Sequence, residues 1–360
     1  MMRIYLSNPT KIEKEFYDYY RPEISSRIGS QIKYVSDRIK NVKQRDQFFN
    51  TKQIKKLDLS KGKRLSKLKD VYFILKGLSS EDELKRILIG APSVLADLAK
   101  SKQYECRLVK FFLSKIFDYK SLSKKSKGYY LYKLSSDIGI KVCVYCNISF
   151  IKTVYSKEKK QVLRPIFDHF YSKSRFPLLA MSLYNLIPCC YYCNSSLKGN
   201  VEFSLENNLH PYIEGFSSDI EFGLSYESQS SVNFLDESSF SIVLNKSKSC
   251  TKDKERRGLG TAKNSKNANA KVFKTTDVYN NYKDVIGIFL FQIQSFQQDY
   301  QIAVTNITNT SRESVLKRID RVLGIRRPPE QQIHHSFGKI KNDIGRKFLK
   351  VSYMVKLDSN

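Results

Sequence analysis

The residues best suited to chemistry in this 360-residue chain are four cysteines in two pairs. The pairs are Cys143-Val-Tyr-Cys146 and Cys190-Tyr-Tyr-Cys193, and each has the two-residue spacing that lets one tight turn direct both thiolates at a single ion. Two such turns supply the four ligands of a tetrahedral structural Zn²⁺ site. Zinc would therefore fix both ends of the segment between the pairs.

The other cysteines leave one ambiguity. Cys189 precedes Cys190 and offers an alternative ligand at a three-residue gap from Cys193, but the repeated two-residue gap favours Cys190. Cys106 and Cys250 have no partner at ligand spacing, and we assign them no role. The cysteine count of seven is odd, and the chain opens without the apolar core of a signal peptide. We therefore expect a cytoplasmic protein, in which a disulfide framework is disfavoured.

Between the two pairs, Asp168 and His169 place a carboxylate beside an imidazole. The Asp168 carboxylate and the side-chain carbonyl of Asn194 are hard oxygen ligands suited to Mg²⁺. An unperturbed histidine has a pKa of about 6.5 and can deprotonate a water molecule that attacks phosphorus. A metal ion would polarise the phosphate and neutralise the leaving oxygen. The combination predicts phosphodiester hydrolysis.

The elements that position these residues follow from composition. Residues 148–156 and 162–167 have the β-branched and aromatic content of strands, with a charged turn between them, and predict a hairpin. Pro177 and Pro188 break the next region into a loop and a short strand. Asn194-Ser195-Ser196 then predicts the cap of a helix that begins near Leu197.

This pattern resembles the HNH endonucleases with a ββα-metal site, in the branch that carries a four-cysteine zinc. The match runs from Cys143 to about Asn200, and its closest parts are Asn185-Leu186-Ile187-Pro188 and the stretch 193–199. The segment 168–177 is also similar to prokaryotic defence nucleases, such as the HNH component of Septu-type antiphage systems. Such nucleases often work with a separate ATPase, and the absence of a Gly-rich Walker sequence predicts that a partner brings any ATP chemistry.

The resemblance implies a role for each motif residue. His169 would be the general base, Asp168 and Asn194 would hold a catalytic Mg²⁺ or Mn²⁺, and Asn185 would orient the loop that carries the histidine. The four-cysteine zinc would be structural. Three cations within the motif are candidates for holding phosphates: Lys173, Arg175 and Lys198.

The composition indicates a nucleic-acid partner. The formal net charge is +28, with 63 Lys+Arg against 35 Asp+Glu, and an excess of this size attracts phosphates through counterion release. The excess lies in residues 1–130 and 246–360, whereas residues 131–245 are nearly neutral. We expect DNA in preference to RNA. No apolar run reaches the length of a membrane helix, so no membrane association is expected.

We expect an α+β protein in which a zinc-stapled core lies between helical, basic flanks. Its predicted parts are a helical region (1–130), the zinc-containing nuclease domain (131–245), a flexible basic linker (246–271) and a helical C-terminal region (272–360). Ser80 and Glu83 have capping-box spacing at the start of one expected helix.

Two other classes of function remain open. The cysteine turns would also suit a zinc-ribbon-like module that binds nucleic acid without cleaving it, or a structural partner in a defence complex. His210 is close enough in sequence to return to the site, although a loop histidine before proline is more often structural. The His334-His335 pair lacks a companion at ligand spacing, and we assign it no role.

Overall fold

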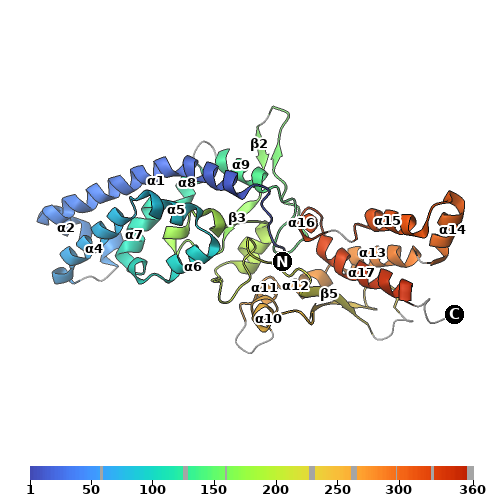
Figure 1. Ribbon diagram of the computed structural model, residues 1–360. Helices are drawn as coiled ribbons and strands as arrows, with labels where there is room; N and C mark the ends of the chain where they lie inside the picture. The colour runs from blue at the N-terminus through green and yellow to red at the C-terminus, as the bar shows by residue number, and fades with distance from the viewer. Residues whose placement is uncertain are drawn as a thin grey trace.

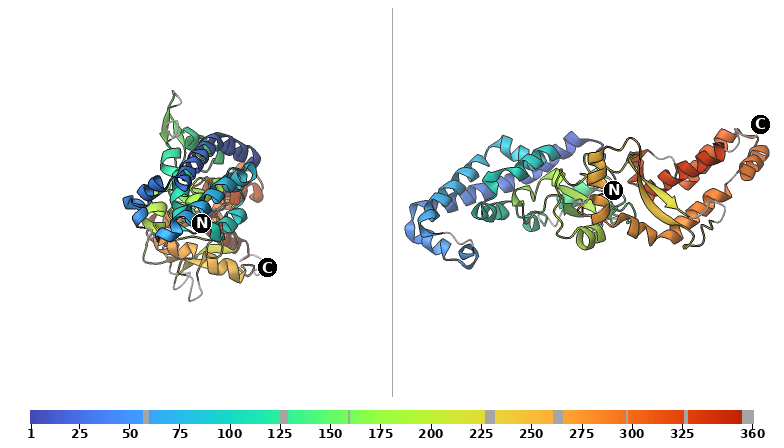
Figure 2. Two further views of the ribbon diagram at one scale, coloured as in Figure 1. Left: turned by 90° about the vertical axis from the view of Figure 1, so that its left-hand side faces the viewer. Right: turned by 90° about the horizontal axis from the view of Figure 1, so that it is seen from below.

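The computed structural model describes residues 1–56, 60–124, 129–158, 160–226, 232–260, 266–296, 298–325 and 328–354. Within these ranges the chain is mainly helical and has three two-stranded antiparallel sheets, so the predicted α+β class is confirmed. The molecule is elongated. An N-terminal helical region forms one end, the small sheets lie near the middle, and the C-terminal helices form the other end (Figures 1 and 2).

The N-terminal region is organised by one long helix, α1 (Pro9–Lys40). Asn8 caps it by accepting a hydrogen bond from the backbone N–H of Lys11 at 3.1 Å, and Pro9 supplies the fixed φ favoured in the first turn. Its buried residues recur at helical spacing and face the helices that follow. Those helices are α2 (Val42–Phe49), α3 (Lys52–Lys55), α4 (Arg64–Gly77), α5 (Glu81–Ile89), α6 (Pro92–Lys100), α7 (Arg107–Ile116), α8 (Tyr119–Leu122) and α9 (Tyr129–Ile138).

The expected cap of α5 is confirmed, because the Ser80 hydroxyl accepts a hydrogen bond from the backbone N–H of Glu83 at 3.3 Å. Helix α7 buries a continuous apolar face made of Leu108, Val109, Phe112, Leu113 and Ile116. These apolar faces pack with α1 into one hydrophobic core of the N-terminal region.

The predicted hairpin forms, but it is shorter than expected. Strand β1 (Val154–Tyr155) pairs with β2 (Gln161–Leu163), and this hairpin projects from the rest of the molecule (Figure 1). Residues before β1 instead return to the first cysteine turn: Phe150 bridges Val142, and the backbone N–H of Ile151 donates to Lys141 O at 2.9 Å. Pairing with that turn removes 148–151 from the hairpin.

The central unit is an antiparallel strand pair followed by a helix. Strand β3 (Ile166–His169) pairs with β4 (Leu186–Cys189), with Asp168 opposite Ile187 and His169 opposite Leu186. Every residue of β4 is buried. Two short helical turns, η4 (Pro177–Leu179) and η5 (Leu183–Asn185), fill the connection between the strands.

The helix after β4 is a π-helix, η6 (Tyr192–Lys198). The sequence predicted its start near Leu197, and that prediction is wrong, because the second cysteine turn is itself the first turn of the helix. The backbone N–H of Asn194 donates to Cys190 O at 3.2 Å. Gly199, at φ +48°, ends the helix, and its N–H donates to Asn194 O at 2.9 Å.

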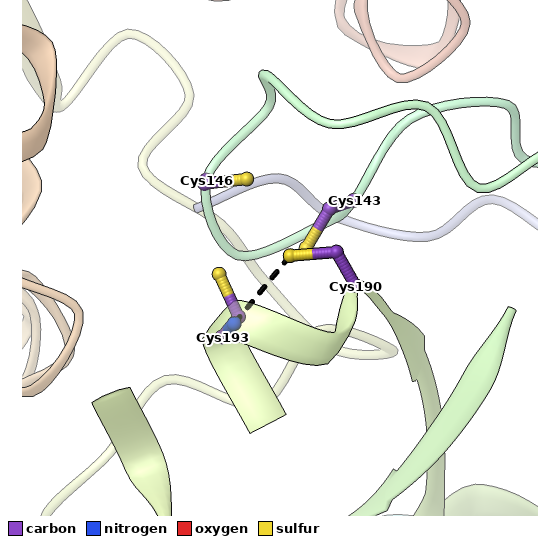
Figure 3. Close-up of side chains that lie close together, drawn as sticks. All are labelled: Cys143, Cys146, Cys190 and Cys193. Atoms are coloured by element: carbon purple, nitrogen blue, oxygen red, sulfur yellow. Dashed lines mark hydrogen bonds between the residues drawn. The ribbon is translucent and has the colours of Figure 1, made fainter. Parts of the chain in front are cut away.

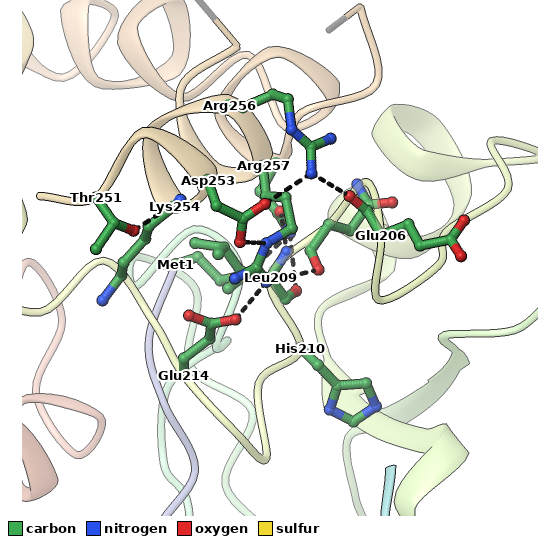
Figure 4. Close-up of polar contacts among 12 residues, drawn as sticks. Met1, Glu206, Leu209, His210, Glu214, Thr251, Asp253, Lys254, Arg256 and Arg257 are labelled. Carbon is green, nitrogen blue, oxygen red and sulfur yellow. Dashed lines mark hydrogen bonds and ion pairs between the residues drawn. The ribbon is translucent and has the colours of Figure 1, made fainter. Parts of the chain in front are cut away.

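The third sheet pairs β5 (Ile220–Ser225) with β6 (Ser241–Lys246). The span predicted to be a flexible linker contains a helix, α10 (Lys252–Gly258), followed after 261–265, which lie outside the described residues, by α11 (Asn269–Val272). Helix α10 is held by ion pairs of Arg257 with Glu214 and Asp253, and by Arg256 donating to Glu206 O at 2.7 Å (Figure 4). Long-range ion pairing therefore orders a segment whose composition predicted a linker.

The C-terminal region is helical, as its apolar spacing predicted. Helix α17 (Gly338–Met354) packs on β5, and α13 (Lys283–Ser295) packs on α17 and on α15 (Arg312–Leu323). The remaining helices are α12 (Thr275–Asn280), α14 (Gln298–Thr308) and α16 (Pro329–Gln332). No helix among the described residues combines the length and apolarity that a membrane crossing requires.

Candidate metal centre and hydrolytic site

The four cysteines of the two turns converge on one point. The sulfur atoms of Cys143, Cys146, Cys190 and Cys193 all lie within 4.8 Å of one another (Figure 3). Four converging thiolates at this spacing can hold a metal ion, and the donor set suits Zn²⁺. None of the seven cysteines is in a disulfide. The prediction that Cys190 rather than Cys189 completes the cluster is confirmed.

Backbone N–H groups support the cysteine turns. In the second turn the N–H of Cys193 donates to Cys190 Sγ at 3.4 Å, a contact that favours the thiolate. In the first turn the N–H of Asn147 donates to Cys143 O at 2.8 Å, and Asn147 adopts a left-handed φ of 56°. Hydrogen bonds from the other three cysteines lower the pKa of Cys190. The thiol of Cys189 lies outside the cluster, and burial raises its pKa.

The first turn also anchors the C-terminal region. The Asn147 side chain donates to Gln332 O at 3.1 Å and accepts from the backbone N–H of Lys339 at 2.9 Å. The hydroxyl of Tyr279 donates to Cys146 O at 2.8 Å, and the N–H of Phe337 donates to Asn147 O at 2.8 Å. The metal turn is thus connected directly to α12, α16 and the start of α17.

Asp168 is almost fully buried and has a partner on each oxygen. The ammonium of Lys198 donates to Asp168 Oδ1 at 2.9 Å and to the backbone carbonyl of His169 at 2.9 Å. The hydroxyl of Tyr145, from the first cysteine turn, donates to Asp168 Oδ2 at 2.7 Å. Lys198 reaches this position because it is the last residue of η6, which packs beside β3.

This arrangement bears on two of the predicted roles. Lys198 was predicted to hold a phosphate, yet its ammonium is buried on Asp168 and on the His169 carbonyl. Asp168 and Asn194 offer oxygens of the type that Mg²⁺ prefers, but the charge of Asp168 is already balanced by Lys198. The residues fit a divalent ion here only if the Lys198 ammonium moves away from Asp168 Oδ1.

The imidazole of His169 is held in one orientation. Its Nε2 lies 3.0 Å from the carbonyl oxygen of Ala180, which can only accept, so Nε2 carries the proton and Nδ1 is left as the basic atom. The ring of Tyr119 stands edge-on to the imidazole at 4.6 Å between centroids. The pKa of His169 is lowered to about 3, mainly by burial and then by the positive charge of Lys173, while the Ala180 carbonyl opposes the shift.

Asn185 is fully buried and fastens the loop that follows His169. Its Oδ1 accepts from the backbone N–H of Tyr171 at 2.7 Å, and its Nδ2 donates to Tyr171 O at 3.1 Å and Leu179 O at 2.8 Å. Leu179 precedes Ala180, whose carbonyl holds the imidazole. Asn185 therefore fixes the backbone that orients His169.

The other predicted residues lie farther out. Asn194 is half-buried on η6. Lys173 is exposed, with its ammonium 5.1 Å from the centre of the Tyr119 ring that covers His169. Arg175 is exposed and paired with Glu202. His210 is completely buried, with its ring 4.3 Å from that of Phe170, so it lies behind the site.

Sequence reasoning missed Tyr145, Tyr119 and Ala180. Tyr145 had a signal, because it lies inside the first cysteine turn and the zinc cluster would bring that turn to η6. Tyr119 and Ala180 had none, since one contributes a ring from a helix in the N-terminal region and the other only a backbone carbonyl.

Comparisons with models of protein families, with curated proteins and with solved structures gave no match to this chain. The residues and their geometry define a four-cysteine metal centre and a two-strand and helix unit that carries the buried residues Asp168, His169 and Lys198, with Asn185 buried in the connection between the strands.

Proposed function

We propose that this protein is a metal-dependent endonuclease of the HNH type, which hydrolyses phosphodiester bonds in nucleic acid, with DNA favoured over RNA. The observation that carries the proposal is the hydrogen bond between His169 Nε2 and the Ala180 carbonyl. It leaves Nδ1 unprotonated on a ring held in one orientation, and the net charge of +28 attracts the phosphate backbone.

His169 acts as the general base in this proposal. With a pKa of about 3 the imidazole is neutral across the physiological range and Nδ1 is unprotonated, but it is a weak base, so general-base catalysis requires its pKa to rise when nucleic acid binds. Asn185 fixes the loop that holds the ring. Lys173, exposed near Tyr119, is available to contact a neighbouring phosphate.

Asp168 and Asn194 are the proposed ligands of a catalytic Mg²⁺ or Mn²⁺. A divalent ion bound there supplies Lewis acidity and offsets the charge of the leaving oxygen. Lys198 must leave Asp168 Oδ1 before the carboxylate can bind a metal ion fully. Bound nucleic acid would favour replacement of the ammonium by the metal ion, because its phosphates attract the ammonium. The setting of antiphage defence or restriction, and a separate ATPase partner, rest on the resemblance of residues 168–177.

The test is incubation of the zinc-loaded protein with plasmid DNA, and separately with RNA, in Mg²⁺ or Mn²⁺. We expect cleavage that stops without divalent metal and falls by about 10²- to 10⁴-fold in His169→Ala, the range for loss of a general base. His335→Ala is the matched control, because this exposed histidine lies three residues after α16 and is not a proposed catalytic residue, so the rate should be unchanged. Cleavage by His169→Ala at the wild-type rate would refute the assignment.

A second function is favoured by the ion pair of Lys198 with Asp168. If that pair persists when nucleic acid is bound, the carboxylate stays neutralised and the protein binds without cutting. In that case the wild type would shift nucleic acid on a gel and leave it intact in both metals.

A further inference from the structure

Two tyrosines, Tyr191 and Tyr192, lie side by side on the outside of the second cysteine turn. They separate Cys190 from Cys193, whose thiols converge inward on the cluster, so the residues between them face outward. Their exposed fractions are 64% and 69%, and their ring centroids lie 6.1 Å apart at an interplanar angle of 80°. The metal turn therefore presents two nearly perpendicular aromatic rings to solvent.

The surroundings of this pair are polar. Ser195 and Ser196, which follow on η6, are exposed, as are Gly199 and Asn200 beyond its end. A stable protein interface buries about 800 Å² on each partner around an apolar centre. Two rings beside serines form a much smaller apolar surface, which suits flat ligands that stack on single side chains.

The pair is connected to the hydrolytic cluster by the helix itself. Lys198, at the other end of η6, contacts Asp168 and the His169 carbonyl. Tyr192 and Lys198 are the first and last residues of this seven-residue helix. Stacked nucleotides are spaced about 3.4 Å along a strand, so a strand lying along η6 would place the pair within a few nucleotides of the site.

We propose that Tyr191 and Tyr192 stack on unpaired bases of the nucleic acid whose phosphate is hydrolysed, so that the substrate is single-stranded or locally opened. This inference rests on the proposed nuclease function. The positive charge of residues 1–130 and 246–360 supplies the attraction to phosphates, and the two rings, which lie in the nearly neutral span between them, supply a sequence-independent contact that a closed duplex, whose base faces are covered, cannot make.

The test measures binding apart from cleavage. The zinc-loaded full chain, without added Mg²⁺ or Mn²⁺, is titrated into a labelled single-stranded oligonucleotide and into the blunt duplex of the same sequence. The variants are Tyr191→Ala/Tyr192→Ala, Tyr191→Phe/Tyr192→Phe and Phe73→Ala. Phe73 is the matched control, because its exposed fraction on α4 is also 69% and it lies far from the cysteine turns in sequence.

The double alanine variant should bind the single strand at least about 30-fold more weakly, given about 1–3 kcal/mol for each of the two stacked bases. Its affinity for the duplex should hardly change, and the double phenylalanine and Phe73→Ala variants should match the wild type. The salt dependence of single-strand binding should also be unchanged, because stacking releases no counterions. Zinc content and thermal unfolding, measured on each variant, exclude a general loss of structure.

Unchanged single-strand affinity in the double alanine variant overturns the inference, and capture of a protein by these tyrosines would then explain their exposure. Equal losses for single strand and duplex overturn it as well. Tyrosine-dependent binding, with no cleavage in the plasmid and RNA assay, supports base stacking and contradicts the nuclease proposal. Cleavage in that assay, with binding that does not depend on the tyrosines, supports the nuclease proposal and contradicts base stacking.

Discussion

Lys198 Nζ lies 2.9 Å from Asp168 Oδ1, and the two side chains are 3% and 4% exposed. An isolated charge at such a depth would be costly, so each partner depends on the other. Tyr145 completes the set by donating to the second oxygen of Asp168. The pair joins the end of η6 to β3, and it determines both the stability of the site and the state of the carboxylate that a metal would need.

Removing one partner of this pair should be strongly destabilising. Lys198→Met leaves the Asp168 carboxylate buried without a counter-ion, and breaking a buried pair in this way costs about 3–5 kcal/mol. Urea unfolding of the zinc-loaded protein measures the loss. Adding Asp168→Asn should recover part of it. Lys85→Met, which breaks an exposed pair with Glu81, is the control and should cost at most about 1 kcal/mol.

The metal centre predicts different results for adjacent cysteines. Cys190→Ala removes one of the four converging thiols, so zinc binding and the stability that depends on it should be lost. Cys189→Ala alters a buried thiol outside the cluster and should retain the full zinc content. Metal analysis of the purified variants checks both results. Equal zinc loss in the two variants would contradict the assignment of ligands.

The link from the first cysteine turn to the C-terminal region can be tested at Asn147. Asn147→Gly tolerates the left-handed φ of 56° but removes the side-chain bonds to Gln332 and Lys339. Amide hydrogen exchange in residues 332–340 should therefore accelerate, while the N-terminal helices keep their protection. Exchange that is unchanged there would show that the link contributes nothing to stability.

Stability should fall in acid because of His210. Burial lowers its pKa to about 3, from an ordinary value of 6.5, so between these pH values the unfolded chain takes up a proton that the folded protein does not. The free energy of unfolding is thus highest above pH 6.5 and decreases as the pH falls toward 3. His169, with the same shift, adds a contribution of the same sign.

The measurement is thermal unfolding of wild type and His210→Gln across this pH range. Glutamine does not titrate, so the variant should lose less stability between neutral and acid pH than the wild type. Cysteine thiolates also take up protons in acid, and for this reason the difference between the two proteins is the quantity compared. Parallel pH curves would show that His210 does not contribute.

Local patterns predicted the parts of this fold that depend on nearby residues. The two-residue cysteine spacing predicted each of the two metal-binding turns, and Ser80 and Glu83 predicted a helix start. Each of these features is decided within a few residues of sequence. The roles predicted for His169, Asp168, Asn185 and Asn194 in catalysis remain predictions.

The features that sequence did not predict depend on distant contacts. Lys198 looked like a surface cation, and only the packing of η6 on β3 brings it to Asp168, thirty residues earlier in the chain. The segment around α10 looked like a linker because its charges are dense, but Arg257 pairs with the Glu214 carboxylate and Arg256 donates to the Glu206 backbone carbonyl, about 40–50 residues away. The number of charged residues in a segment does not show which distant residues they contact in the fold.

The hydrogen bond between Asn147 and the backbone of Lys339 spans 192 residues, so it forms late during synthesis of the chain. During synthesis at about 5–20 residues per second, the first cysteine turn emerges roughly 10–40 seconds before the segment that braces it. The zinc-binding thiols can gather as soon as the second turn is made. The braced form of the metal centre must wait for the last helix, so a nascent or truncated chain would carry the centre without its C-terminal support.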